Sequence, residues 1–329
     1  MTMRITAVEL EPWNVEAFGQ HYPNAKLLTT PASKEVDLGN PEALAIFIYS
    51  KIDAAVLDKM PSLKFITTMS TGYDHIDLAA CAARGILVSN VPAYGEQTVA
   101  EHTVALLLAL SRMIVRSVEA TRAGNFDLAA LRGHDMGGKV AGVIGTGRIG
   151  QHVIKMLRGL GMEIIAYDPF PNPAKATELG FTYVDLDHLI TTADVVTLHC
   201  PATKETEHIL NRDRLMRMKK SAFLINTARG SLIETAGLVA ALEAGYFTGV
   251  GLDVLEEERA MKDTSGPSTL PAINDDMTVL ADHALLRHPR VIVTPHNAFN
   301  SEESVRRIFA TTMENLQAFE AGQPIHLVH

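Results

Sequence analysis

A chain of 329 residues is longer than one ordinary domain, so two packed domains are the leading expectation, with a single barrel as the alternative. Hydrophobic residues make up 47% of the sequence and charged residues 20%, which excludes disordered, fibrous and collagen-like proteins. The 38 acidic residues outnumber the 29 lysines and arginines, and a net charge of −9 would repel a phosphate backbone. Nucleic acid is therefore not an expected partner.

The two cysteines, Cys81 and Cys200, lie far apart and follow no metal-ligand spacing. So few cysteines fit a reducing cytosol. The first ten residues have no apolar core of the kind a secretory signal needs, and the longest aliphatic run, Val104 to Leu110, is too short to span a bilayer. We expect a soluble, unprocessed cytoplasmic protein with no metal site.

Short apolar segments in the first third of the sequence alternate with polar or helical stretches. This alternation is typical of parallel sheets covered by helices and predicts an α/β fold. One long helical segment, Glu96 to Arg122, then follows, and we place a domain border at its start, after residue 98. The expected strands of this first, small sheet are Arg4 to Val8, Ala45 to Tyr49, Lys64 to Thr67 and Ile86 to Val88.

A second series of six strands is what a doubly wound nucleotide-binding domain requires. The last helix begins near Asn300, with Glu303 three residues on in a capping arrangement. No further strand follows this helix, so we expect it to return to the first domain. That domain then comprises residues 1–98 and 300–329, and residues 99–299 form the second. The six strands are Val140 to Ile144, Glu163 to Tyr167, Val195 to His199, Ala222 to Asn226, Gly249 to Asp253 and Val291 to Thr294.

A glycine-rich turn links the first strand of this series to a helix. Gly145 permits a tight turn, Gly147 lets the backbone approach a pyrophosphate, and Gly150 allows close helix-to-strand packing. Asp168 ends the next strand, where a carboxylate would accept hydrogen bonds from ribose hydroxyls and repel a 2′-phosphate. Arg148 falls inside the turn, near the pyrophosphate. The pattern predicts a dinucleotide site that favours NAD over NADP.

Three residues near strand ends are candidates for catalysis. Arg229 could bind a substrate carboxylate in a fork, His296 could exchange a proton near neutral pH, and Glu258 could orient that histidine. Each residue alone could equally be a surface ion pair or a structural group. Because the carboxyl ends of parallel strands meet at one edge of a sheet, their shared placement favours catalysis.

A series of motifs in the sequence resembles the NAD-dependent D-isomer-specific 2-hydroxyacid dehydrogenases. The motifs occur in family order and cover nearly the whole chain. The resemblance implies two doubly wound parallel-sheet domains, a Rossmann NAD domain and a flavodoxin-like substrate domain, with a cleft between them. The motifs are Val91-Pro92-Ala93-Tyr94, Ala100-Glu101-His102, Gly145 to Gly150, His199-Cys200-Pro201, Asn226 to Gly230, Gly251 to Val254 and Thr294-Pro295-His296.

The resemblance also implies roles for individual residues. Arg229 would bind the 2-oxo acid, His296 would donate the proton, and Glu258, five residues after Asp253, would be the partner of His296. The backbone amides of Thr71 and Gly72 would hold the substrate carboxylate, and Tyr94 and Phe299 would lie near the substrate. The residues expected along the cofactor are Gly145, Gly147, Arg148, Ile149, Gly150, Asp168, Cys200, Pro201, Thr206, Thr227, Ala228 and Asp253.

Features outside this shared set are most similar to the D-lactate dehydrogenase branch. They are Gly124-Asn125-Phe126, the long segment Arg259 to Arg290, and Phe299. We therefore expect NADH-dependent reduction of pyruvate to D-lactate by a homodimer, in which Ala100-Glu101-His102 resembles the family's dimer contact. Glyoxylate, hydroxypyruvate or a bulkier 2-oxo acid remains an alternative substrate. An NAD-sensing protein similar to a corepressor is the alternative from another class.

Overall fold

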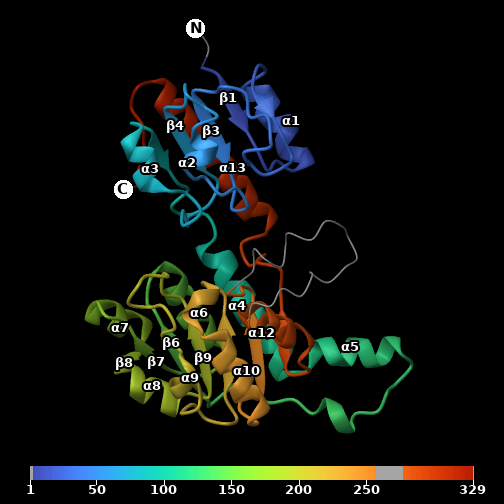
Figure 1. The fold of residues 1–329 in the computed structure, drawn as a ribbon. Helices are drawn as coiled ribbons and strands as arrows, with labels where there is room; N and C mark the ends of the chain where they lie inside the picture. Colours follow the sequence, from blue (N-terminus) through green and yellow to red (C-terminus); the bar gives the residue numbers. More distant parts are fainter. Residues whose placement is uncertain (1–2, 257–276, 329) are drawn as a thin grey trace. The chain divides into compact units, whose positions relative to one another are not determined.

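The chain forms two compact units, one built from Met1–Gly95 with Ser301–His329 and the other from Glu96–Asn300 (Figure 1). This computed structural model describes residues 3–256 and 277–328. The unit borders lie close to those expected after residue 98 and before residue 300.

The first unit is a five-stranded parallel sheet with strand order β2-β1-β3-β4-β5. This is the order of flavodoxin-like doubly wound sheets, as predicted. The two-residue strand β2 lies at the edge, and its length gave no sequence signal. The strands are β1 Ile5–Ala7, β2 Lys26–Leu27, β3 Ala43–Ile46, β4 Phe65–Thr68 and β5 Leu87–Ser89, and the helices are α1 Pro12–His21, α2 Ala54–Leu57, α3 Leu78–Ala83 and α13 Glu302–Glu320.

Helix α13, the last helix, packs in the first unit through aromatic contacts. The ring of Phe319 stacks on Phe65 with 4.4 Å between centroids, and Phe309 meets Phe18 edge-on at 5.5 Å. The predicted start of this helix was one residue early, because its cap is Ser301, whose side chain accepts the amide of Ser304 at 3.1 Å.

Strand β3 ends earlier than the predicted Ala45 to Tyr49. The carboxylate of Glu9 accepts the amides of Tyr49 at 2.8 Å and Ser50 at 2.9 Å, so the chain leaves the sheet after Ile46. Burial raises the pKa of this carboxyl group.

The second unit is a seven-stranded parallel sheet with strand order β12-β11-β10-β9-β6-β7-β8. The strand order reverses between β6 and β9, which is the switch point at which Rossmann folds bind nucleotides. All six predicted strands are present, and the two-residue edge strand β8 was missed. The strands are β6 Val140–Ile144, β7 Glu163–Tyr167, β8 Thr182–Tyr183, β9 Val195–Leu198, β10 Phe223–Asn226, β11 Gly249–Leu252 and β12 Val291–Val293.

The prediction of one long helix over Glu96 to Arg122 was wrong. The segment forms α4, Glu96–Ser111, and α5, Ile114–Arg122, with a 59° bend between them. The carbonyl of Ser111 accepts the amide of His134 at 2.7 Å, and Met113 takes a left-handed conformation with φ 55°, so the helix cannot continue.

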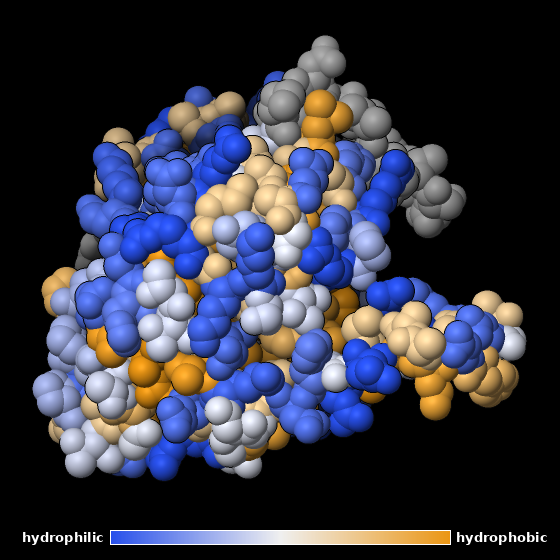
Figure 2. All heavy atoms as spheres, turned by 90° about the horizontal axis from the view of Figure 1, so that it is seen from below, coloured by the Kyte–Doolittle hydropathy of each residue, from blue (hydrophilic) through white to orange (hydrophobic). Residues whose placement is uncertain are grey.

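Helix α5 leads away from the sheet of its unit and buries none of its residues (Figures 1 and 2). We call the segment from Ile114 to Leu131 the arm. Its apolar side chains are exposed, Phe126 to 75% and Leu128 to 77%. Within the described residues, no single helix is long and apolar enough to cross a membrane; α4 and α5 pass that test only as a bent pair, by length and composition.

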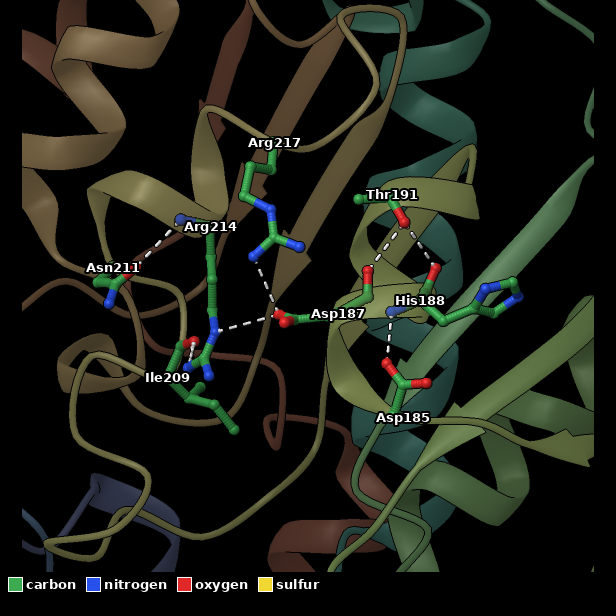
Figure 3. Close-up of polar contacts among 8 residues, drawn as sticks. All are labelled: Asp185, Asp187, His188, Thr191, Ile209, Asn211, Arg214 and Arg217. Carbon is green, nitrogen blue, oxygen red and sulfur yellow. Dashed lines mark hydrogen bonds and ion pairs between the residues drawn. The ribbon is translucent and has the colours of Figure 1, made fainter.

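Surface ion pairs connect the short helices of the second unit. The Asp187 carboxylate lies 3.2 Å from a terminal nitrogen of Arg217 and 3.9 Å from Nε of Arg214 (Figure 3). These side chains are partly exposed, so each pair contributes at most about 1 kcal/mol. The helices are α6 Arg148–Gly159, α7 Pro173–Leu179, α8 Leu186–Thr192, α9 Arg212–Leu215, α10 Thr235–Glu243 and α12 Met277–Arg287, with 3-10 turns at Ala129–Leu131 and Gly230–Leu232.

Candidate active site

Most of the predicted site residues of the second unit follow five neighbouring strands. The glycine turn follows β6, Cys200 follows β9, Arg229 follows β10, Asp253 follows β11 and His296 follows β12. These strands are parallel and adjacent, so their carboxyl ends form one continuous edge of the sheet. The topology therefore gathers loops from distant parts of the sequence at one edge.

Two of the three glycines in the turn serve the fold itself. Gly145 has φ +94°, and a Cβ there would lie 2.6 Å from the amide nitrogen of Cys200. A Cβ on Gly150 would lie 2.1 Å from the carbonyl oxygen of Gly145. Close packing of β6, α6 and the β9 loop therefore requires both glycines.

Gly147 is different, because no part of the described protein requires it. It caps helix α6 at φ −65°, and among residues 3–256 and 277–328 no atom would lie within 4 Å of a Cβ at this position. Absence of a side chain leaves the backbone open at the start of a twelve-residue helix, where amides and the helix dipole attract anions. This open position fits the pyrophosphate of a dinucleotide.

Asp168, after β7, is bound to the same turn. One of its oxygens accepts the amide of Thr146 at 2.8 Å and the Thr146 hydroxyl at 3.0 Å, and the other accepts the amide of Phe170 at 3.0 Å. These bonds fix the carboxylate and leave acceptor capacity for a ribose hydroxyl. The exposed guanidinium of Arg148 lies 3.1 Å from Glu96, an ion pair that the sequence did not indicate. Ile149, at the start of α6, is half-buried.

The loop after β9 carries three predicted cofactor residues. Burial raises the pKa of the Cys200 thiol to about 11, which suits a pocket wall better than a nucleophile. The Thr206 hydroxyl donates to the carbonyl of Pro201 at 2.7 Å and accepts the amide of Thr203 at 2.8 Å. Thr206 thus closes the turn in which Pro201 is exposed.

The loop after β10 is fixed by Asn226, whose role the sequence did not indicate. Its side chain accepts the amide of Ala228 at 3.0 Å and donates to the carbonyl of Arg229 at 2.8 Å. Arg229 is half-buried and its guanidinium donates to the Ala228 carbonyl at 2.8 Å. The hydroxyl of Thr227 lies 2.8 Å from that of Thr103 on α4. The predicted carboxylate-binding arginine is therefore held on a rigid turn.

His296 lies in a strained turn after β12. It has φ +54°, a left-handed conformation that costs about 1–3 kcal/mol for a residue other than glycine. The Asp253 carboxylate, 1% exposed, accepts the amides of Asn297 at 3.0 Å and Ala298 at 2.9 Å, the two residues that follow the histidine. Asp253 thus holds the turn that presents His296. Phe299, three residues on, is half-buried.

Glu258, the predicted partner of His296, lies outside the described residues. Glu256, two residues earlier, has partners of its own. Its carboxylate lies 2.5 Å from Nε2 of His208 and accepts the amide of Thr235 at 3.2 Å. These contacts tie Glu256 to the loop after β9 and to helix α10.

In the first unit, the loop after β4 presents Thr71 and Gly72. The Thr71 hydroxyl donates to the Val91 carbonyl at 2.9 Å, and Asn90 donates to the Thr71 carbonyl at 2.8 Å. Their carbonyl and hydroxyl groups are thus engaged, whereas the amides of Thr71 and Gly72 donate to no described residue. Two neighbouring amides with no acceptor among the described residues fit a carboxylate. The carbonyl of half-buried Tyr94 accepts Nε of Arg307 at 2.7 Å.

A model of the D-isomer specific 2-hydroxyacid dehydrogenase NAD binding domain matches residues 104–298. The chain belongs to this dehydrogenase family. The predicted family, the α/β fold of two parallel-sheet units and the NAD cofactor are therefore confirmed. The dehydrogenase is an NAD-dependent oxidoreductase acting on D-2-hydroxy acids.

Similar proteins differ in their named substrates. The D-lactate dehydrogenase of Escherichia coli K12 is 38% identical over 90% of this chain and 88% of its own length. A glyoxylate reductase of Korarchaeum cryptofilum is 34% identical over 98% of this chain and 90% of its own. The structure of the Aquifex aeolicus D-lactate dehydrogenase, complexed with NAD and lactic acid, is 35% identical with a TM-score of 0.86, covering 97% of this chain and 96% of that one.

Proposed function

We propose that the dehydrogenase reduces pyruvate to D-lactate with NADH. Similarity over almost the full chain to a structure described with both NAD and lactic acid is the observation that carries this substrate. The sequence features that resemble the D-lactate dehydrogenase branch, among them Phe299 beside the His296 turn, support pyruvate as the substrate. Glyoxylate is the second candidate, because a glyoxylate reductase has a similar identity and coverage.

Arg229 and His296 would act on different groups of the substrate, the carboxylate and the keto oxygen. They follow β10 and β12, which flank β11. Neighbouring strands lie about 4.8 Å apart, so the two strand ends are about 10 Å apart, a span that two long side chains can share with a three-carbon acid. The Arg229 fork would bind the carboxylate, which orients the keto group toward the histidine.

Protonated His296 would donate its proton to the keto oxygen as the carbonyl is reduced, and would take it back in the reverse direction. NADH supplies the hydride when bound at the glycine turn. Glu258 is the proposed partner that keeps the imidazole in the required tautomer. The backbone amides of Thr71 and Gly72 are further proposed donors to the substrate carboxylate.

We also propose that the dehydrogenase is a homodimer and that the arm is part of its interface. A nine-residue helix without buried side chains is not stable alone in water. The exposed apolar side chains of the arm, including Ile114, Val118 and Leu128, form the kind of surface that a second copy covers. His102, in the Ala100-Glu101-His102 motif that resembles the family's dimer contact, is part-buried within its own unit.

Initial rates with NADH and a panel of 2-oxo acids test the substrate. The panel contains pyruvate, glyoxylate, hydroxypyruvate, phenylpyruvate, 2-oxoisocaproate and oxaloacetate, and the product is analysed for chirality. The highest kcat/KM for pyruvate with D-lactate as product is expected. A higher kcat/KM for another acid would make that acid the substrate in place of pyruvate. Tight NADH binding without turnover of any acid would exclude the proposed reaction.

A further inference from the structure

Helix α4 contacts both of the loops that carry the proposed catalytic residues, through two consecutive side chains. His102 places Nε2 3.0 Å from the hydroxyl oxygen of Thr294, and Thr103 places its hydroxyl 2.8 Å from that of Thr227. Thr294 begins the turn that presents His296, and Thr227 begins the loop that presents Arg229. One helix therefore contacts both the turn of the proposed acid and the loop of the proposed carboxylate-binding group.

The sheet is shaped to let α4 come this close. Two glycines of β11 face the helix: a Cβ on Gly249 would lie 3.1 Å from Leu110, and a Cβ on Gly251 would lie 3.2 Å from Leu110 and 3.3 Å from Leu106. A side chain at either position would require these leucines to shift by a few tenths of an ångström. Glycines in β11 thus allow the close approach of α4 from which His102 and Thr103 reach Thr294 and Thr227.

The hydrogen-bond directions identify His102 as a donor. The Thr294 hydroxyl gives its one proton to Oδ1 of Asp253, so its oxygen can only accept from the imidazole. His102 therefore carries a proton on Nε2, which also lies 3.5 Å from Oδ1 of Asp253. A chain of bonds runs from His102 through Thr294 to the carboxylate that holds the amides of Asn297 and Ala298.

We propose that His102 and Thr103 are positioning residues for the reaction, acting on different steps. His102 fixes the Thr294 and Asp253 pair, which keeps His296 in its left-handed conformation for proton transfer. Thr103 fixes Thr227, and with it the loop that aims Arg229 at the substrate carboxylate. The proposal rests on the catalytic roles proposed above for His296 and Arg229.

Loss of the two contacts should affect different kinetic parameters. A turn that is free to move by about 1 Å misplaces the acid, which can lower a rate about 100-fold. His102→Leu should therefore lower kcat about 10-fold to 100-fold, with KM for the 2-oxo acid and NADH binding little changed. Thr103→Val, which removes only the hydroxyl, should raise KM about 10-fold and leave kcat near the wild-type value.

Conservative variants separate positioning from general stability. His102→Gln keeps an amide nitrogen at the place of Nε2 and should restore most of kcat, and Thr103→Ser should restore KM. His188→Leu, at an exposed histidine on α8 of the same unit (Figure 3), is the matched control and should leave kcat and KM unchanged. If His102→Leu does not fold, Thr294→Val interrupts the same chain of bonds and takes its place.

Steady-state kinetics on the best acid of the panel, with melting temperatures and NADH titrations, decide the outcome. A kcat loss at position 102 that glutamine restores, together with a KM effect at position 103 that serine restores, supports the proposal. Unchanged kinetics, or equal losses for Leu and Gln, would overturn it. His296→Ala is measured beside them: if that variant is fully active, the proposed function fails instead, because the histidine is then not the acid.

Discussion

A Cβ atom on Gly150 would lie 2.1 Å from the carbonyl oxygen of Gly145, whereas a Cβ on Gly147, between them, would meet no atom of the described residues within 4 Å. Glycine is therefore needed for different reasons at the three positions of this motif. Two of them allow the polypeptide to pack on itself, and the third leaves open space beside the start of α6, which we propose is used by the bound cofactor.

Alanine substitutions should separate these two roles. Gly147→Ala should keep the wild-type melting temperature and raise the Kd for NADH at least about 10-fold, because the added methyl group occupies the space of the pyrophosphate. Gly150→Ala should lower the melting temperature by several degrees, since overpacking a fold costs about 1–3 kcal/mol. Calorimetry and NADH fluorescence titrations measure both. A Gly147→Ala protein with normal NADH affinity would contradict the assigned pyrophosphate position.

His296→Ala should lower kcat about 10²-fold to 10⁴-fold, the usual contribution of a positioned general acid, and leave NADH binding intact. His296 is half-buried, and the amides of the next two residues are held by Asp253, so the fold should tolerate the change. Stopped-flow and steady-state rates are compared with those of His188→Ala. Near-normal turnover would exclude His296 from proton transfer.

Asp168→Ala should weaken NADH about 10-fold to 100-fold and NADPH much less, because hydrogen bonds to a charged group contribute about 1.5–3 kcal/mol. Asp168→Asn is the matched control, since an amide oxygen can still accept the bonds from Thr146. Dissociation constants for both cofactors are measured for each variant. Equal losses for NADH and NADPH would argue against a ribose contact.

The buried imidazole of His199 leads us to expect that the folded protein is less stable in acid. Burial lowers the pKa of this histidine to about 3, while in the unfolded chain the pKa returns to about 6.5. Below about pH 6.5 only the unfolded chain binds this proton, so the free energy of unfolding decreases as the pH falls, by about 2 kcal/mol between pH 6.5 and 5. His199→Gln should reduce this loss in urea titrations at the two pH values. An unchanged loss would mean that His199 accepts the proton while folded.

The exposed apolar side chains of the arm lead us to expect a homodimer. Leu128→Asp places a charge on a side chain that is 77% exposed in the single chain, so a monomer would tolerate it. In a dimer the same change would bury an unpaired carboxylate and shift the protein toward monomer. Sedimentation velocity at several concentrations measures the effect, with Lys175→Asp on α7 as the surface control. A wild-type protein that sediments as a monomer would remove the proposed interface.

Local patterns in the sequence predicted most of the fold. Strands β6 and β7 begin and end at the predicted residues, because buried parallel strands give continuous apolar runs between polar breaks. The two-residue strands β2 and β8 and the break after Ser111 were not predicted. The helix breaks where the carbonyl of Ser111 accepts the amide of His134. His134 is distant in sequence, so no local pattern could indicate this hydrogen bond.

The sequence by itself determined the two-unit α/β architecture, the dinucleotide turn and the residue types of the proposed chemistry, since strand order and residue identity set which loops reach one edge of the sheet. Only the tertiary structure decided which side chains hold those loops. Asp253 binds the turn around His296 and His102 reaches Thr294 across 192 residues of sequence, contacts that depend on how closely α4 packs on β11. Such contacts arise from packing in three dimensions, for which spacing along the chain carries no signal.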